Sequence, residues 1–474
     1  MTQPVHEKTT AWLPELLYTE GRFSRDMALE ADARGRITRI APAAQVKADS
    51  VIHLKNRALL PGLVNAHSHA FQRVIRGRTE YRTGQHRDSF WTWREMMYSA
   101  ATRLSPEDIY DASRMAFLEM ALSGITSVGE FHYLHHAPDG KPYTDANLLA
   151  KEVVRAARDV GLRIALLRVA YARAGHNAPP NERQSRFIER DTENYLLHAD
   201  ALQAALTTRN ELEDNGAWMG IAPHSVRAVP LPYLKEVIGF AAERSLPVHM
   251  HLAEQPAEVT ACLEEYGRTP VQLLESEGLL SDRFTGVHAV HVTPEEAQAM
   301  ARARAMVCAC PTTERNLGDG VVPADLFFRE GVRVALGTDS HAQIDLLEDA
   351  RELELNLRLE KLERAVLSRE NDELSSLAAR LLDSATLHGA ESIGADSGSL
   401  EPGRLADFFT VDLHHPSIAG ASVEDLLPCI VFSLAPSSVR EVCVGGKLVI
   451  EDGQHPAQAE IVRSFAALQR RLWS

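Results

Sequence analysis

The feature that most restricts the fold of this chain is a repeated alternation of short apolar runs with helix-like stretches. The alternation fills residues 59–394, and SPEDIYDASRMAFLEMALS is one such stretch, with Ser105 suited to cap its N-terminus. A strand followed by a helix, repeated about eight times, predicts a parallel sheet closed into a (β/α)8 barrel. The apolar runs are RALLPGLVNAHSH, GITSVGEFHY, LRIALLRVAY, AWMGIAPHS, LPVHMHLAE, FTGVHAVHVT, AMVCACPTT and VRVALGTDSH.

The two ends of the chain share a different, strand-rich pattern. Near the N-terminus, MALEADARGRITRIAP alternates apolar and polar residues around a glycine-containing turn, which predicts a hairpin. After residue 395, LADFFTVDL and VREVCVGGKLVIEDG return to this pattern. We therefore expect residues 1–58 and 395–474 to build one small β-domain beside a barrel of residues 59–394. The last segment, AEIVRSFAALQRRL, predicts a terminal helix.

Charge and cysteine content limit the classes of partner. The chain has 50 Lys and Arg against 65 Asp and Glu, and its formal net charge of −15 argues against nucleic acid or an anionic membrane surface. An anionic substrate would therefore need cations placed locally. The five cysteines show no CxxC spacing and indicate neither a disulfide framework nor a cysteine zinc site. Because no signal-peptide pattern and no apolar run of membrane-spanning length occur, we expect a soluble cytoplasmic protein.

The segment VNAHSHAFQR, residues 64–73, carries the first candidate metal ligands. Side chains alternate along a strand, so His67 and His69 project to the same face. Two such histidines are common in turns that bind no metal. This pair, however, ends the first predicted barrel strand, and the active sites of such barrels assemble at strand ends.

Later strand ends supply further candidates. In PVHMHLAE, His251 suits a third metal ligand, and Glu254 suits a proton shuttle that reaches over a metal-bound water. His249 is expected to pack or to form a hydrogen bond behind the site. In GVHAVHVT, either His288 or His291 is expected to face the barrel mouth.

Asp339, at the end of the run VALGTDSH, can complete the ligand set. Three imidazoles and one carboxylate, with a position left open for water, are typical of catalytic rather than structural zinc. Iron and manganese accept the same ligands. We therefore expect a divalent metal at the barrel mouth, with Zn²⁺ favoured over Fe²⁺ or Mn²⁺.

The motifs PGLVNAHSHA, HLAE, VHAVH and ALGTDSH together resemble those of the amidohydrolase superfamily. The resemblance implies a (β/α)8 TIM-like barrel, a β-sandwich made from both chain ends, and a homodimer. Glu254 then matches the proton shuttle, and His288 matches the residue that polarises the water or the substrate. No strand-end lysine matches one that bridges two metals, so one metal is expected. The implied metal ligands are His67, His69, His251 and Asp339.

A second set of motifs, HSHAFQR, DSFWTWRE, EFHYLHH and APHSVRAV, is similar to one branch of that superfamily over essentially the whole chain. The branch hydrolyses the formimino group of N-formimino-L-glutamate in histidine degradation. Such a substrate carries two carboxylates, which guanidinium groups bind bidentately. Arg73, beside the metal histidines, stays ambiguous. The implied substrate contacts are Gln72, Arg94, Tyr133, His224 and Arg227.

The expected reaction is a hydrolytic deimination that yields N-formyl-L-glutamate and ammonia. A metal-activated water attacks the formimino carbon, Asp339 or His288 helps to take its proton, and Glu254 passes a proton to the departing nitrogen. Two alternatives stay open. A superfamily deaminase of a purine, pyrimidine or related ring would need stacking and few cations, so the arginines count against it. The intact ligands and Glu254 count against a catalytically inactive barrel that acts as a binding protein.

Overall fold

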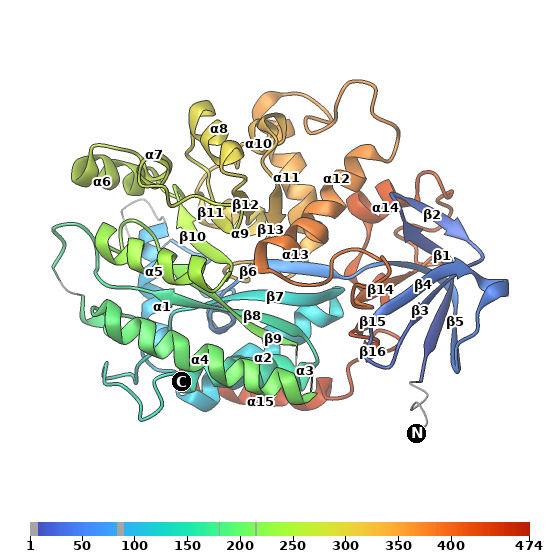
Figure 1. Ribbon diagram of the computed structural model, residues 1–474, viewed down its shortest axis with the longest axis horizontal. Helices are drawn as coiled ribbons and strands as arrows, with labels where there is room; N and C mark the ends of the chain where they lie inside the picture. Colours follow the sequence, from blue (N-terminus) through green and yellow to red (C-terminus); the bar gives the residue numbers. More distant parts are fainter. Residues whose placement is uncertain (1–7, 83–89, 180, 214–215) are drawn as a thin grey trace.

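The computed structural model describes residues 8–82, 90–179, 181–213 and 216–474, so Asp88 and Ser89 of the DSFWTWRE motif lie outside it. Its larger part is the predicted barrel, in which eight parallel strands follow one another in sequence order (Figure 1). These strands are β6 (Leu63–Ser68), β7 (Ile125–His132), β8 (Arg163–Ala170), β9 (Ala217–Pro223), β10 (Val248–Leu252), β11 (Phe284–His288), β12 (Met306–Ala309) and β13 (Val334–Leu336).

The barrel closes between its last and first strands. The amide of Asp339, just beyond β13, donates to the carbonyl of His67 at 3.0 Å, and the amide of His69 donates to the carbonyl of Asp339 at 3.1 Å. Gly337 permits this close approach, because a Cβ at that position would lie 2.7 Å from the Cβ of His67. Two segments that carry predicted metal ligands are thus hydrogen-bonded to each other by their backbones.

Helices cover the outside of the barrel, as the alternating pattern predicts. Every residue of β7 is buried, which is typical of a parallel strand covered on both faces. Ser105 caps α2 (Pro106–Leu122) in a capping box with Asp108, which satisfies two backbone amides at the helix start. The other helices of this part are α1 (Phe90–Ala101), α3 (Leu148–Val160), α4 (Thr192–Glu213), α5 (Leu231–Glu243), α6 (Pro256–Tyr266), α7 (Pro270–Ser276), α8 (Pro294–Arg302), α9 (Pro311–Leu317), α10 (Ala324–Glu330), α11 (Leu346–Lys361), α12 (Ser376–Ala385) and α13 (Leu387–Ile393).

Strands from the two chain ends share a second sheet, and the predicted hairpin is the antiparallel pair of β3 and β4 within it. Strand β5 pairs with the N-terminal β1 and the C-terminal β14, so it joins the two ends. This sheet has its own core, in which the Trp12 and Phe408 rings lie edge to face at 5.2 Å. Its strands are β1 (Thr10–Thr19), β2 (Arg22–Arg25), β3 (Met27–Ala31), β4 (Ile37–Pro42), β5 (Ser50–Pro61), β14 (Phe408–Asp412), β15 (Val439–Val444) and β16 (Lys447–Ile450).

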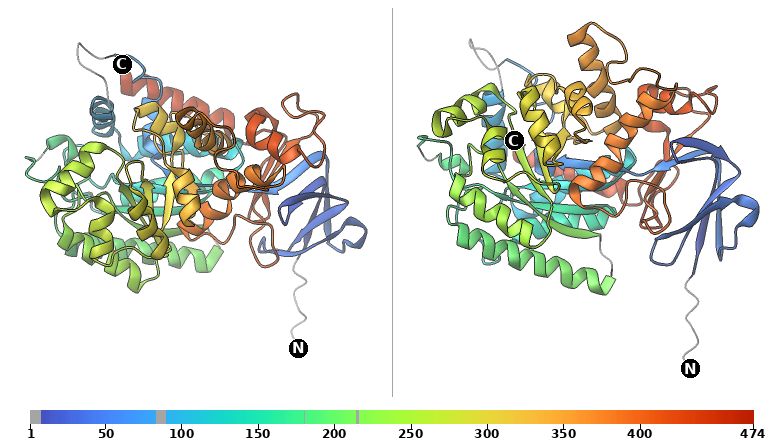
Figure 2. Two further views of the ribbon diagram at one scale, coloured as in Figure 1. Left: turned by 90° about the horizontal axis from the view of Figure 1, so that it is seen from above. Right: turned by 45° about the horizontal axis from the view of Figure 1, so that its top comes forward.

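The C-terminal segment contributes to both parts of the molecule. The predicted terminal helix is present as α15 (Gln458–Trp473), but it lies along the barrel against α2 (Figures 1 and 2). An ion pair of 2.6 Å between Arg114 and Glu460 joins these two helices. Helix α14 (Leu426–Ser433) likewise contacts α11 and α12. In the described part of the chain, no helix combines the length and the apolar character needed to cross a membrane.

Candidate active site

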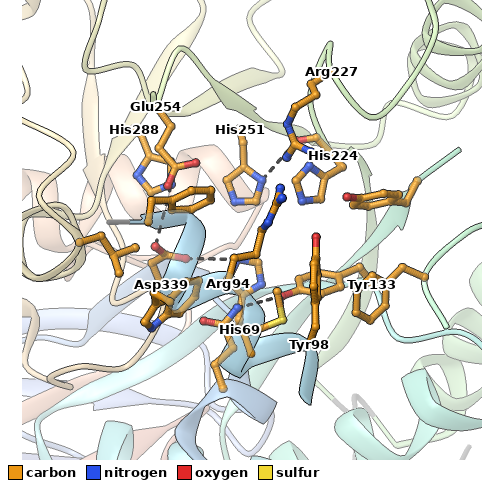
Figure 3. Close-up of a pocket in the computed structure, with 17 residues that line it drawn as sticks. His69, Arg94, Tyr98, Tyr133, His224, Arg227, His251, Glu254, His288 and Asp339 are labelled. Carbon is orange, nitrogen blue, oxygen red and sulfur yellow. Dashed lines mark hydrogen bonds and ion pairs between the residues drawn. The ribbon is translucent and has the colours of Figure 1, made fainter. Parts of the chain in front are cut away.

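The predicted site residues gather at the end of the barrel where the carboxyl ends of its strands meet. His67 lies in β6, His69 directly follows it, His251 lies in β10, and Asp339 follows β13. Figure 3 shows side chains from several strand ends pointing into one pocket. All the predicted site residues except His67 line it: His69, Gln72, Arg94, Tyr133, His224, Arg227, His251, Glu254, His288 and Asp339.

The four predicted metal ligands converge on one point. The Nε2 atom of His67 lies 3.2 Å from Nε2 of His69 and 3.2 Å from Nε2 of His251. The Oδ1 atom of Asp339 lies 3.3 Å from Nε2 of His67 and 3.2 Å from Nε2 of His69. All four side chains are buried, and their ligand atoms lie within 4.8 Å of one another.

Hydrogen bonds on the outer side of these rings leave acceptor atoms facing one another. Nδ1 of His69 donates to the carbonyl of Phe131 at 2.9 Å, and Nδ1 of His251 donates to the carbonyl of His224 at 3.2 Å, so both Nε2 atoms carry lone pairs. Burial lowers the pKa of His67 to about 3 and that of His251 well below its usual value, which keeps both rings neutral. Four atoms that can act as acceptors thus converge on one point. A divalent metal with three nitrogens and one oxygen as ligands satisfies them.

Unusual backbone conformations orient the side chains at three strand ends. Ala253, His288 and Asp339 have φ angles of 49°, 71° and 45°, in the left-handed region that residues other than glycine rarely adopt. They lie at the ends of β10, β11 and β13. Such strain is retained where the surrounding structure fixes the orientation of functional groups.

Glu254 and His288 lie beside the ligand group. Nε2 of His288 is 3.8 Å from Oε1 of Glu254 and 3.9 Å from Oδ2 of Asp339. Burial raises the pKa of Glu254, so its carboxyl group holds a proton more readily than an exposed one. Burial by itself would lower the pKa of His288, but the carboxylates of Glu254, Glu314 and Asp339 outweigh it and raise that pKa well above its usual value.

Glu314 is a site residue that the sequence analysis does not identify. It lies in α9 and is 2% exposed, and its Oε1 accepts hydrogen bonds from Nδ1 of His288 at 3.1 Å and from the amide of Cys310 at 2.8 Å. The carboxylate therefore holds the imidazole of His288 with Nε2 turned toward Glu254 and Asp339. In the sequence, Glu314 is visible only as a glutamate soon after the strand run AMVCAC. Its position in the sequence does not predict that its side chain contacts a residue of the neighbouring strand.

The rest of the pocket is lined by cations and aromatic rings. Nε2 of Gln72 donates to the Tyr133 hydroxyl at 2.8 Å, whereas its Oε1 has no partner among the described residues. Arg94 lies over the Trp91 ring, 4.5 Å from its centroid, and Arg227 donates to a backbone carbonyl at 3.3 Å. Within the described ranges, neither guanidinium forms an ion pair with a carboxylate. Lining residues that the sequence analysis does not identify include Met97, Tyr98, Tyr171, Phe187 and Leu317.

Three other residues have roles outside the pocket. His249, two residues before His251 on β10, donates to the backbone carbonyl of Ser392 at 2.8 Å and does not line the pocket, as expected for a histidine behind the site. His291 donates to a backbone carbonyl at 3.0 Å, so His288 is the histidine of GVHAVHVT that faces the barrel mouth. Arg73, which the sequence leaves ambiguous, forms an ion pair with Glu119 at 2.6 Å.

Comparisons with known proteins agree with this architecture. Residues 58–449 match the amidohydrolase family. The chain is 39% identical over 450 residues to the formimidoylglutamate deiminase of Pseudomonas aeruginosa, covering 95% of this chain and 96% of that one. It is 28% identical over 426 residues to a 5-methylthioadenosine/S-adenosylhomocysteine deaminase of Caldanaerobacter subterraneus subsp. tengcongensis, with 89% and 88% covered. The crystal structure of an amidohydrolase from Brucella melitensis has a TM-score of 0.88 to this structure at 32% identity, with 99% of this chain and 100% of that chain covered. This chain therefore belongs to the amidohydrolase family.

Proposed function

We propose that this protein hydrolyses N-formimino-L-glutamate to N-formyl-L-glutamate and ammonia. The observation that carries the proposal is one pocket that contains both a metal-binding group and two guanidiniums, Arg94 and Arg227, without carboxylate partners among the described residues. A substrate with two carboxylates would pair with these cations, whereas a neutral ring would leave them unpaired. The Pseudomonas aeruginosa relative, called formimidoylglutamate deiminase, supports the same substrate class.

The proposed metal is a single Zn²⁺ ion held by His67, His69, His251 and Asp339. The donor set of three imidazoles and one carboxylate is the type found in catalytic zinc sites. When bound, the ion supplies the Lewis acidity that makes a water molecule nucleophilic near neutral pH. The homodimer and the cytoplasmic location that the sequence suggests stay predictions.

The side chains around this point can move the protons that the reaction requires. Water adds its oxygen to the formimino carbon, the bond from that carbon to the terminal nitrogen breaks, and both water hydrogens end on the departing ammonia. The carboxyl group of Glu254 accepts one proton and delivers it to the nitrogen, a role suited to a pKa raised by burial. Oδ2 of Asp339 borders the same space and can help to take the water proton, whereas Nε2 of His288, 3.9 Å from it, carries a hydrogen that can polarise the water or the substrate.

The remaining pocket residues are proposed to bind and orient the substrate. The unpartnered Oε1 of Gln72 can accept a hydrogen bond from an N–H of the amidine-like formimino group. Burial, reinforced by the charge of Arg227, lowers the pKa of His224 well below its usual value, so this imidazole is neutral and can donate or accept. Arg94 and Arg227 pair with the carboxylates, and Tyr133 borders the same pocket.

Removal of either pocket arginine should weaken substrate binding severely. We expect Arg94→Met and Arg227→Met each to raise KM for N-formimino-L-glutamate by roughly 30-fold or more, because each leaves a desolvated carboxylate unpaired. Ammonia release at varied substrate concentrations measures this effect. The matched control is Arg73→Met, which removes an arginine paired with Glu119 and should leave KM unchanged.

The same variants test the ring-deaminase alternative, which the 28% identical relative and the aromatic pocket wall keep open. A purine or pyrimidine deaminase would respond little to the loss of the two guanidiniums. Unchanged KM values for N-formimino-L-glutamate in both variants would therefore contradict the proposed binding mode. A catalytically inactive binding protein would release no ammonia from any substrate.

Glu314 provides a further test, because it acts through His288. We expect Glu314→Ala to lower kcat by about 10- to 100-fold, the usual cost of losing a residue that orients a catalytic imidazole, with KM and metal content little changed. Glu314→Gln should recover most of the rate, since the Cys310 amide selects the side-chain oxygen and keeps an acceptor for Nδ1 of His288. A loss in the glutamine variant as large as that in the alanine variant would contradict this orienting role.

A further inference from the structure

Two tyrosines with no role in the proposed mechanism occupy one end of the pocket. Tyr98 comes from α1, and Tyr171 directly follows β8. Both are 2% exposed and line the pocket, and their rings pack against Phe187 at 5.7 and 6.0 Å. In Figure 3 the Tyr98 hydroxyl points toward the side of the pocket where Arg94 and Arg227 end.

The two hydroxyls are held by one buried amide. Nε2 of Gln184 donates to the Tyr98 hydroxyl at 2.8 Å and to the Tyr171 hydroxyl at 2.7 Å, so both hydrogens of that nitrogen are used. Each hydroxyl thus acts as an acceptor toward Gln184, and its own hydrogen must point elsewhere. In the part of the chain that the structure describes, neither hydroxyl donates to a protein acceptor. Two O–H donors are therefore available to a bound molecule.

The tyrosine pair lies beyond the aromatic residues that contact the metal-binding histidines. The ring of His69 contacts Tyr133 at 5.1 Å, and that of His251 contacts His224 at 4.8 Å. Tyr171 contacts His224 at 4.6 Å and so lies one ring beyond it. The ring contacts that lead from His69 to Tyr98 pass through two rings, because Tyr133 contacts Phe187 at 5.1 Å and Phe187 contacts Tyr98 at 5.7 Å.

This placement matches the far end of the proposed substrate. The formimino carbon must lie at the metal-binding group, and the side-chain carboxylate of glutamate lies beyond the α-carbon and the methylene groups. Arg227, which interacts electrostatically with both tyrosines, supplies positive charge at this end. A carboxylate accepts about four hydrogen bonds, more than one bidentate guanidinium provides, so the two hydroxyls complete its coordination.

We propose that Tyr98 and Tyr171, held by Gln184, bind the side-chain carboxylate of the substrate and thereby select an acidic side chain over an apolar one of equal length. The proposal rests on the proposed function, since it states which residues bind one end of that substrate. It makes the two tyrosines specificity-determining residues and Gln184 a positioning residue.

The test compares N-formimino-L-glutamate with N-formimino-L-norvaline, in which a methyl group replaces the side-chain carboxylate. We expect Tyr98→Phe and Tyr171→Phe each to raise KM for the glutamate substrate roughly 10- to 100-fold, because each removes one hydrogen bond to a charged group. The kcat value for this substrate and the kcat/KM value for the norvaline analogue should stay the same. Gln184→Leu, which frees both hydroxyls, should also raise KM for the glutamate substrate while sparing the norvaline analogue.

The matched control is Tyr233→Phe. Its hydroxyl donates to the Glu189 carbonyl at 3.0 Å, is buried and lies outside the pocket, so its loss should leave both substrates unaffected. Equal losses of kcat/KM on both substrates, or an unchanged KM in both pocket variants, would overturn the inference. Neither result would contradict the proposed function. If the wild-type protein releases no ammonia from N-formimino-L-glutamate, the proposed function itself fails.

Discussion

Replacement of Glu254 by glutamine is expected to lower kcat by roughly 10²- to 10⁴-fold, the usual scale of general acid–base catalysis. Glutamine has nearly the same shape as glutamate, but it cannot accept a proton from water and deliver it to the departing nitrogen. Substrate binding and the metal-binding group should persist, because Glu254 lies outside the set of converging ligand atoms. Ammonia release under saturating substrate, with metal analysis of the same preparation, measures the effect.

The exposed Glu264, on α6, provides a matched control for this substitution. Glu264→Gln makes the same chemical change ten residues along the chain and should leave kcat unchanged. If Glu254→Gln turned over within about threefold of the wild-type rate while retaining its metal, Glu254 would not be the proton shuttle, since that role is worth far more.

Removal of one ligand should abolish both metal binding and activity. We expect purified His251→Ala to contain little metal and to lose roughly 100-fold or more in rate, because its Nε2 is one of four converging donors and the metal generates the nucleophile. Elemental analysis and ammonia release together check this result. A chelator should produce the same loss in the wild-type protein, and Zn²⁺ should restore it.

His291→Gln is the matched control, because His291 is close in sequence to the site but donates to a backbone carbonyl instead of joining the ligand atoms. This variant should retain metal and activity. An active His251→Ala protein free of metal, or a wild-type protein that is active after complete metal removal, would contradict the proposed chemistry.

The strand ends explain why so much of the site could be predicted from the sequence. In β6 the alternation of a strand places His67 and His69 on one side, and in β10 it does the same for His249 and His251, of which His251, nearer the carboxyl end of the strand, reaches the pocket. Barrel closure then brings Asp339 against the first strand. These relations depend on local periodicity and on the order of parallel strands, both of which are visible in a sequence.

The residues that the sequence did not reveal depend on tertiary packing. Glu314 reaches His288 from a short helix, and Gln184, at the end of the 3-10 helix Glu182–Gln184, joins two tyrosines from separate elements. No spacing between motifs encodes such contacts. The terminal helix shows the same limit. Its sequence predicts a helix, but it does not show that this helix packs on α2 of the barrel and not on the sheet whose strands precede it in the chain.

The central claim is that the pocket holds a dicarboxylate whose formimino group lies at the metal. The most direct measurement is ammonia release by the metal-loaded protein from N-formimino-L-glutamate, guanine, cytosine and S-adenosylhomocysteine, each supplied alone. We expect rapid release from N-formimino-L-glutamate, with N-formyl-L-glutamate as the second product, and little or none from the three ring compounds. Release from a ring compound without release from N-formimino-L-glutamate would contradict the claim.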